Sequence, residues 1–268
     1  MIVTEALSTD RIRQVLTAET VAGHLYLFGE VPSTNSLLDK LAKAGAREGT
    51  VVLADAQSAG RGRLGKVWFS PAGVNLYVSV LFRPLITPSA VTVFSFIASL
   101  ALADAIQDEG VEPAIKWPND ILVGAKKVAG IVAQSAASDE RVDFVILGTA
   151  VNLNVEREAL KSALGRVGQS AASLREAMAR EIDRNAFAAR FLTLLDDWFQ
   201  MYLAGGAGVI LRAWRHRDIT PGRRIQVREG PHDFDGRAIG VNTEGDLVVE
   251  ESNGRVRRVV TGQIRFLD

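Results

Sequence analysis

The pattern of hydrophobic residues changes near residue 219, and this change constrains the fold more than any other feature of the sequence. Before it, runs typical of strands are mixed with runs typical of helices, which predicts an α+β fold with a mixed, mainly antiparallel sheet. After Thr220-Pro221-Gly222, short alternating segments are punctuated by glycines, which predicts a small all-β domain such as a five-stranded barrel. We therefore predict two domains, residues 1–218 and 219–268.

Hydrophobic periodicity also places the individual elements. Strands of the larger domain are predicted at residues 24–31, 50–56, 74–82, 114–117, 121–123, 127–134 and 142–153. Helices are predicted at residues 10–17, 34–44, 87–109, 184–203 and 209–217, with Ser33 and Gly45 suited to begin and end the second of them. Strands of the small domain are predicted at residues 224–228, 237–241, 247–250 and 256–260.

Charge and composition narrow the class of protein. The 31 Lys and Arg residues match 31 Asp and Glu residues, so the basic excess of a dedicated nucleic-acid binder is missing. The absence of cysteine excludes disulfides and thiolate chemistry and fits a reducing compartment. The longest apolar run, residues 91–106, is interrupted by polar residues and falls short of a membrane span, so we predict that it is a buried helix. We expect a cytoplasmic protein with no nucleic-acid or membrane partner.

A glycine-rich segment with the sequence GRGRLGK, residues 60–66, satisfies two phosphate-binding patterns at once. Neither pattern holds, because the following residues do not begin a helix and Val67 stands where a Walker loop needs Ser or Thr. The glycines still allow backbone N–H groups to approach an anion, and Arg61, Arg63 and Lys66 add positive charge. The segment predicts an anion-binding loop, and the alternative is a solvated loop with incidental charges.

Two further segments contain candidate site residues, but each segment taken alone also has an ordinary structural interpretation. Lys116-Trp117-Pro118-Asn119-Asp120 joins a cation, an indole and two short polar side chains, although a capped turn with Trp117 in the core would look the same. Lys126 and Lys127 begin a strand, and because strand side chains alternate, one should face inward and the other outward. An inward lysine would suit a phosphate, whereas a solvated strand end is the alternative.

Taken together, these segments resemble the biotin protein ligase family. Four blocks in the family's order carry the resemblance: Ser33-Thr34-Asn35; Gln57, Gly60 to Gly65, Trp68 to Pro71, Gly73 and Asn75 to Tyr77; Lys116 to Asp120 with Lys127 to Ile131; and Gly148 with Asn152-Leu153. The resemblance implies a class II synthetase-like catalytic domain and a C-terminal SH3-like β-barrel. It also implies the form without the N-terminal DNA-binding domain, because only 23 residues precede the first matched strand. Relatives often pair through sheet edges, so a homodimer is a further expectation.

The implied activity is ATP-dependent biotinylation of protein. Biotin is activated as biotinyl-5'-AMP and transferred to a lysine of the biotin carboxyl carrier protein of acetyl-CoA carboxylase, with Mg²⁺ accompanying ATP. A lipoate or octanoate ligase or transferase is the enzymatic alternative, and the block at residues 116–120 favours biotin over it. A non-catalytic biotin-binding regulator is the other alternative, and retention of Arg61, Arg63 and Lys127 argues against it.

The resemblance also assigns roles to particular residues. Arg63 and Lys127 are the implied catalytic cations, and Asp120 is a candidate to orient the incoming amine or accept its proton. The implied biotin contacts are Ser33, Thr34, Asn35, Gln57, Arg61, Gly62, Arg63 and Lys127. The implied ATP and adenylate contacts are Arg61, Arg63, Trp68, Lys116, Asn119 and Asn152. The sequence does not identify the metal ligands.

Overall fold

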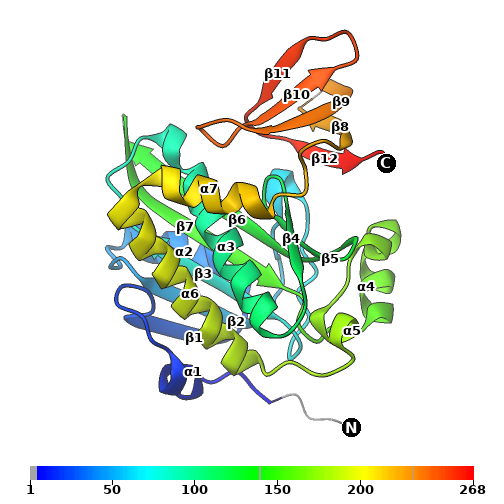
Figure 1. Cartoon of the computed structure of the whole chain (residues 1–268). Helices are drawn as coiled ribbons and strands as arrows, with labels where there is room; N and C mark the ends of the chain where they lie inside the picture. Colours follow the sequence, from blue (N-terminus) through cyan, green and yellow to red (C-terminus); the bar gives the residue numbers. More distant parts are fainter. Residues whose placement is uncertain (1–4, 139, 231) are drawn as a thin grey trace.

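The computed structural model describes residues 5–138, 140–230 and 232–268, and a seven-stranded sheet forms the centre of its larger part (Figure 1). The strand order is β1-β2-β3-β7-β6-β5-β4. These strands are β1 (His24–Val31), β2 (Thr50–Gln57), β3 (Leu76–Phe82), β4 (Pro113–Lys116), β5 (Asp120–Val123), β6 (Lys126–Ser138) and β7 (Arg141–Val151). Among the described strands of this sheet, β1 and β2 form a parallel ladder, and the other ladders are antiparallel. The predicted mixed, mainly antiparallel sheet is confirmed.

Helices cover both faces of this sheet, so the larger part has three layers (Figure 1). On one face, α3 (Thr92–Asp108) and α6 (Arg184–Gly205) pack over the main core. On the other face, α2 (Thr34–Lys43) packs Leu38 against Val52 and Ile146 in a second, smaller core. Because both faces are covered, all residues of β3 are buried, which explains its nearly continuous apolar sequence.

The α3 helix is the apolar run noted in the sequence. The segment Pro88–Asp108 is long and apolar enough to cross a membrane by composition alone. In the structure, however, α3 packs against the sheet and α6, and most of its residues are buried in the main core. The prediction of a buried helix is confirmed, with one difference at its start. A short 3-10 turn, η2 (Pro88–Ala90), precedes α3 instead of a continuous helix from residue 87.

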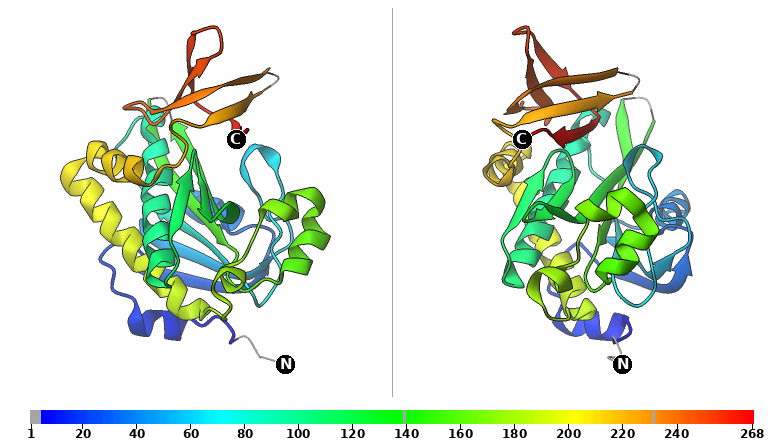
Figure 2. Two further views of the ribbon diagram at one scale, coloured as in Figure 1. Left: turned by 45° about the vertical axis from the view of Figure 1, so that its right-hand side comes forward. Right: turned by 90° about the vertical axis from the view of Figure 1, so that its right-hand side faces the viewer.

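A second, antiparallel sheet follows α7 (Ala207–Arg217) and lies at one end of the larger part, as the two views of Figure 2 show. Its order is β11-β10-β9-β8-β12, formed by β8 (Arg224–Glu229), β9 (His232–Val241), β10 (Leu247–Glu251), β11 (Val256–Val259) and β12 (Gln263–Phe266). In the described residues no ladder joins β11 to β12, so the sheet is open between these edge strands. The small β domain is confirmed, and the division at residue 219 stays a prediction.

Trp117 lies in the turn between β4 and β5 of the larger sheet, and it hydrogen-bonds to the chain that forms the second sheet. Its backbone N–H donates to Thr220 Oγ1 at 3.0 Å, and its indole Nε1 donates to the Gly245 carbonyl at 3.2 Å. The ring is 2% exposed, so the core alternative for this residue is correct. The turn that follows strand β4 is therefore fixed to the second sheet by buried hydrogen bonds.

Several elements escaped the sequence analysis. Helices α4 (Arg157–Leu164) and α5 (Leu174–Met178) lie between β7 and α6, together with the 3-10 segment η3 (Gly165–Ser170). Leu160 and Leu164, one helical turn apart, were the available signal for α4. Strand β12 was missed as well, and β9 begins earlier than predicted. Strand β12 is a short edge strand, and both β12 and the first half of β9 mix charged and apolar residues.

Candidate active site

A cavity of about 880 Å³ opens on the sheet face that carries α2. Its walls come from the start of α2, the glycine-rich loop, the turn between β4 and β5, strands β6 and β7, helix α4 and the start of β12. The structure brings all of the predicted site residues to this cavity: Ser33, Thr34, Asn35, Gln57, Arg61, Gly62, Arg63, Trp68, Lys116, Asn119, Asp120, Lys127 and Asn152.

One wall of the cavity is a network of neutral polar side chains, most of which are buried. Gln57 Oε1 accepts a hydrogen bond from the Thr34 N–H at 2.9 Å, and Gln57 Nε2 donates to Ser70 Oγ at 3.1 Å. The Ser79 hydroxyl donates to Asn35 Oδ1 at 2.6 Å and lies 2.7 Å from Thr34 Oγ1. These contacts hold the first turn of α2 against β2 and β3, so the network is rigid before any ligand arrives.

Close packing between β7 and α2 shapes the same wall. A Cβ atom at Gly148 would lie 2.0 Å from Asn35 Oδ1, so no larger residue fits there while Asn35 keeps its place. Asn35 Nδ2 donates to Gln134 Oε1 at 2.8 Å, which adds a β6 residue to the network. Ser33 is the N-cap of α2 but makes no side-chain capping hydrogen bond. Gln134 and Ser79 carry no motif, and the sequence analysis missed them.

The glycine-rich loop forms a small flap over the cavity, which we define as residues 60–68. Its arms are joined by an antiparallel bridge between Arg61 and Val67 and by a hydrogen bond from the Trp68 N–H to the Gly60 carbonyl at 2.9 Å. The turn at its tip is closed by a hydrogen bond of 2.7 Å from the Gly62 N–H to the Lys66 carbonyl. The flap is therefore an ordered ribbon that bends into the cavity mouth.

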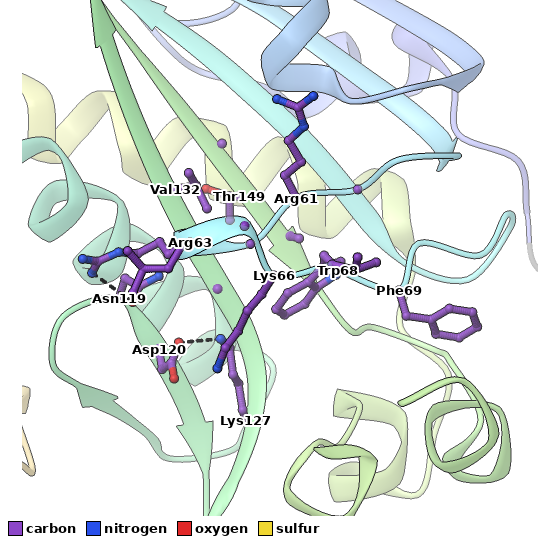
Figure 3. Close-up of a pocket in the computed structure, with 18 of the residues that line it drawn as sticks. Arg61, Arg63, Lys66, Trp68, Phe69, Asn119, Asp120, Lys127, Val132 and Thr149 are labelled. Carbon is purple, nitrogen blue, oxygen red and sulfur yellow. Dashed lines mark hydrogen bonds and ion pairs between the residues drawn. The ribbon is translucent and has the colours of Figure 1, made fainter. Parts of the chain in front are cut away.

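The cavity lining is strongly cationic. Among its described lining residues, five are cations and one is an acid: Arg61, Arg63, Lys66, Lys116 and Lys127 against Asp120. Arg63 points toward Asn119 and Asp120 faces Lys127, whereas Arg61 extends away from this group (Figure 3). An excess of positive charge in a concave site attracts polyanions, and it supports the prediction of an anion-binding loop.

Arg63 is the cation most closely held by other residues. Its Nη2 donates to Thr261 Oγ1 at 3.0 Å, and its Nη1 lies at 3.5 Å from Asn119 Oδ1. Burial lowers the pKa of the Arg63 guanidinium, and the nearby Asp120 carboxylate opposes this shift. A partly desolvated cation gains more from an incoming anion than a fully hydrated one.

Lys127 and Lys126 confirm the predicted alternation along β6. Lys127 Nζ lies 2.5 Å from Asp120 Oδ1 and 5.2 Å from the centre of the Trp68 ring, inside the cavity. Lys126 Nζ instead contacts Glu176 Oε1 of α5 at 2.7 Å, away from the cavity lining. The two neighbouring lysines thus have different surroundings, and only Lys127 can reach a ligand in the cavity.

Comparisons with known proteins decide the family. The sequence profile of the biotin/lipoate A/B protein ligase family matches residues 27–152. The bifunctional ligase/repressor BirA of Bacillus subtilis is 32% identical over 261 residues, which are 97% of this chain and 79% of that protein. The chain belongs to the biotin protein ligase family. A biotin–[acetyl-CoA-carboxylase] ligase of Paracoccus denitrificans is also 32% identical, over 85% of this chain and 95% of its own length.

The fold agrees with this family membership. The structure of the biotin protein ligase from Aquifex aeolicus in complex with biotin and ATP matches with a TM-score of 0.74 at 22% identity. The match covers 91% of this chain and 98% of the Aquifex chain. The central sheet with a second, C-terminal sheet is therefore the biotin protein ligase fold.

Asn152 and the segment after it complete the cavity of this biotin protein ligase. Asn152 Nδ2 donates to the Ala172 carbonyl at 3.1 Å, and the Ala172 N–H donates to the Lys127 carbonyl at 3.0 Å. Through these bonds the chain after α4 lies beside β6 and β7. Apolar residues of this segment, which the sequence analysis missed, then line the cavity: Leu160, Leu164 and Val167.

Lys116 lies where the cavity meets the second sheet. Its Nζ is 4.8 Å from the centre of the Phe266 ring of β12, which is a cation–π contact. Burial lowers the pKa of the Lys116 ammonium, while Asp120 raises it and Lys127 and Lys66 lower it. The prediction for Lys116 named only the nucleotide region, and its contact with the second sheet is visible only in the structure.

The cavity residues fit magnesium only as a companion of ATP. Asp120 is the one acidic side chain among the described lining residues, and no group of three metal-ligating side chains occurs in the described part of the chain. Mg²⁺ prefers oxygen ligands and is often held by one or two carboxylates together with substrate phosphates. Asp120 is the residue here that could contribute such an oxygen.

Proposed function

We propose that the cavity activates biotin with ATP and transfers the biotinyl group to a biotin carboxyl carrier protein. The observation that carries this proposal is the division of one cavity into a buried neutral network and a cationic half. Biotin has the matching chemistry, because its ureido ring is uncharged and its carboxylate must meet the triphosphate of ATP. The family membership of the chain supports the same reaction.

The neutral network suits the ureido ring of biotin. We assign this contact to Ser33, Thr34, Asn35 and Gln57, whose hydroxyl and amide groups offer both donors and acceptors. Thr34 and Gln57 already hold each other in place, so ring binding requires little reorganisation. A site built from fixed polar groups discriminates strongly against ligands that leave those groups unpaired. Lipoate, which has no ureido group, should therefore bind poorly.

The cationic half suits the adenylation step. A carboxylate oxygen of biotin attacks the α-phosphorus of ATP, and the bond to the β-phosphate breaks, so that pyrophosphate leaves with the electron pair. We assign Lys127 and Arg63 to the negative charge that develops on the α-phosphate. Trp68, Lys116, Asn119 and Asn152 are assigned to the nucleotide, and Arg61 and Gly62 to the flap over biotin. Magnesium bound to ATP would offset charge on the leaving pyrophosphate.

The transfer step needs a group that orients the attacking amine. The carrier lysine attacks the acyl carbon of biotinyl-5'-AMP, the amide bond forms, and AMP leaves with the electrons of the broken acyl–oxygen bond. We assign Asp120 to orient this amine and to receive its proton, because its carboxylate lies beside Lys127.

The cellular setting follows from the substrates. We place the protein in the cytoplasm, where ATP and the carrier protein of acetyl-CoA carboxylase are available. A homodimer stays a prediction, and so does the lack of a nucleic-acid partner. The exposed edge of the central sheet at β1 is the surface on which pairing of two copies would be sought.

The test is incubation of the purified protein with ATP, Mg²⁺, biotin and a carrier domain, followed by the intact mass of the carrier. The expected result is a mass increase of one biotinyl group that requires both ATP and biotin. Replacing biotin by lipoate should give no product, and product from lipoate alone would establish the lipoate alternative. Biotin binding without pyrophosphate release would establish the non-catalytic regulator instead.

A further inference from the structure

Among the described residues, one hydrogen bond joins the flap to the second sheet, from Arg63 Nη2 to Thr261 Oγ1. Thr261 lies between β11 and β12, on the side of the second sheet that faces the cavity, and its neighbours Gly262 and Gln263 line that cavity. Among the flap side chains between residues 61 and 67, Arg63 alone hydrogen-bonds to a described residue outside the flap. The remaining hydrogen bonds of this segment close the ribbon on itself.

Thr261 is a firm anchor because the chain around it is tightly packed. A Cβ atom at Gly262 would lie 2.9 Å from the Arg228 carbonyl oxygen, so the loop packs against β8 too closely for a side chain at this position. Strand β12 then pairs with β8 along its whole length. The second sheet is in turn fixed to the β4–β5 turn through the two hydrogen bonds of Trp117.

Asn119 and Thr261, the two hydrogen-bond partners of Arg63, are therefore held in place relative to each other. Asn119 follows Trp117 in the β4–β5 turn, where its Nδ2 donates to the Ile131 carbonyl at 2.6 Å. Thr261 belongs to the sheet to which that turn is fixed. At the base of the flap, Trp68 contacts Lys127 and Ser70. Between residues 61 and 67, both side-chain hydrogen bonds to described residues outside the flap come from the Arg63 guanidinium.

We propose that Thr261 is a positioning residue that keeps the flap closed through Arg63, so that the second sheet sets how long the reactive adenylate stays in the cavity. This inference rests on the proposed function for its consequence, whereas the contact between Arg63 and Thr261 is part of the structure itself. The hydroxyl gives Arg63 the shorter of its two hydrogen bonds, at 3.0 Å against 3.5 Å. A hydrogen bond to a charged group is among the stronger kinds in proteins.

The first experiment measures the flap and needs no substrate. Trypsin cleaves after Arg and Lys, and the flap offers Arg61, Arg63 and Lys66. Thr261→Val keeps the shape of the side chain but removes the acceptor, so cleavage within the flap should become about fivefold faster. Thr261→Ser restores the hydroxyl and should return the rate to that of the unaltered protein. Cleavage elsewhere in the chain, read from the same peptide masses, reports any general loss of stability.

Thr243→Val is the matched control. Thr243 is exposed in the loop between β9 and β10, and its hydroxyl hydrogen-bonds, among the described residues, to the neighbouring Glu244 at 2.7 Å. This variant should leave flap cleavage unchanged. Equal flap cleavage in Thr261→Val and the unaltered protein would overturn the proposed contact.

The second experiment measures the consequence. The protein is loaded with biotin, ATP and Mg²⁺, desalted, and followed for release of biotinyl-5'-AMP. Release should be about fivefold faster in Thr261→Val and unchanged in Thr261→Ser and Thr243→Val. Retention equal to that of the unaltered protein would overturn the role of Thr261. If the unaltered protein forms no adenylate, the proposed function and the retention role both fail, and the cleavage assay still decides the contact.

Discussion

The two halves of the cavity are built in different ways. In the neutral half, Ser33 and Thr34 are 3% and 4% exposed, and their neighbours come from strands in the centre of the main sheet. In the cationic half, the flap residues Leu64 and Val67 are 60% and 78% exposed, and the cations lie on loops, on a strand end and beside the second sheet. One half is fixed by the core, and the other is assembled from loops, a strand end and the second sheet.

This difference matches two kinds of ligand chemistry. A neutral ring is recognised by hydrogen bonds whose directions must be right, which needs rigid groups. A triphosphate and a reactive anhydride must enter, react and stay protected from water, which needs a segment that opens and closes. Changes in the fixed half should therefore alter biotin affinity, and changes in the movable half should alter chemistry and retention.

Lys127→Ala should have the largest effect. Removal of a positioned charge that stabilises a transition state lowers rates by about 10²–10³-fold, so adenylation should fall by that factor while biotin still binds. Pyrophosphate release measures the step. Lys126→Ala is the matched control, because Lys126 contacts Glu176 away from the cavity, and its rate should stay near that of the unaltered protein. Normal adenylation by Lys127→Ala would remove this residue from the mechanism.

Arg63→Gly should have the next largest effect, and it should act on retention. Loss of both external contacts of the flap should speed release of biotinyl-5'-AMP by about 10–100-fold, which corresponds to losing one or two hydrogen bonds of a charged group. Arg63→Lys keeps the positive charge but loses the forked guanidinium. Its release rate should lie between those of Arg63→Gly and the unaltered protein. The prediction fails if the purified variant holds its intermediate as long as the unaltered protein.

Gly148→Ala tests the fixed half. The added methyl group must displace Asn35, whose Oδ1 would lie 2.0 Å away, and so disturb the neutral network. Overpacking of this kind costs about 1–3 kcal/mol, so the Kd for biotin should rise by about tenfold or more. Gly29→Ala on β1, where the new methyl group meets no atom within 4 Å, is the control and should bind biotin normally. Unchanged affinity in Gly148→Ala would show that this wall is not rigid.

Asp218→Asn should have the smallest effect. Asp218 follows α7, just before the second sheet, and this variant tests how its buried carboxyl group affects the free energy of unfolding. Burial raises the pKa of Asp218 to about 6, although its hydrogen bonds with Thr220 act in the opposite direction. Because this folded-state pKa lies above the ordinary value, the stabilising protonated form is lost as the pH rises toward and past 6. Replacement by the neutral amide should therefore raise the free energy of unfolding by about 1–2 kcal/mol at pH 8.

The same comparison at pH 4 supplies the control for Asp218→Asn. There the carboxyl group is protonated in the folded protein, so the variant should gain nothing over the unaltered chain. Urea unfolding at both pH values measures the difference. A gain of equal size at pH 4 and pH 8 would show that the carboxylate charge is not its cause.

The candidate site residues could be predicted from the sequence because they lie in short segments that resemble the motifs of the family. Gln57, Lys116 and Lys127 belong to such segments, and all of them reach the cavity. Periodicity located the long elements for a similar reason, since a buried strand or helix repeats its apolar residues at a fixed interval. It failed for α4, α5 and β12, which are short and mix charged with apolar residues.

The sequence by itself determined the α+β class, the change to a small β domain and a set of candidate site residues that all line one cavity, because these depend on local patterns. Only the tertiary structure decided which side chains hold that set in place. Ser79 acquires its role from strand pairing, and Trp117 from its bonds to the second sheet. Thr261 meets Arg63 across 198 positions of the chain, and such a contact depends on how two sheets pack rather than on any local pattern.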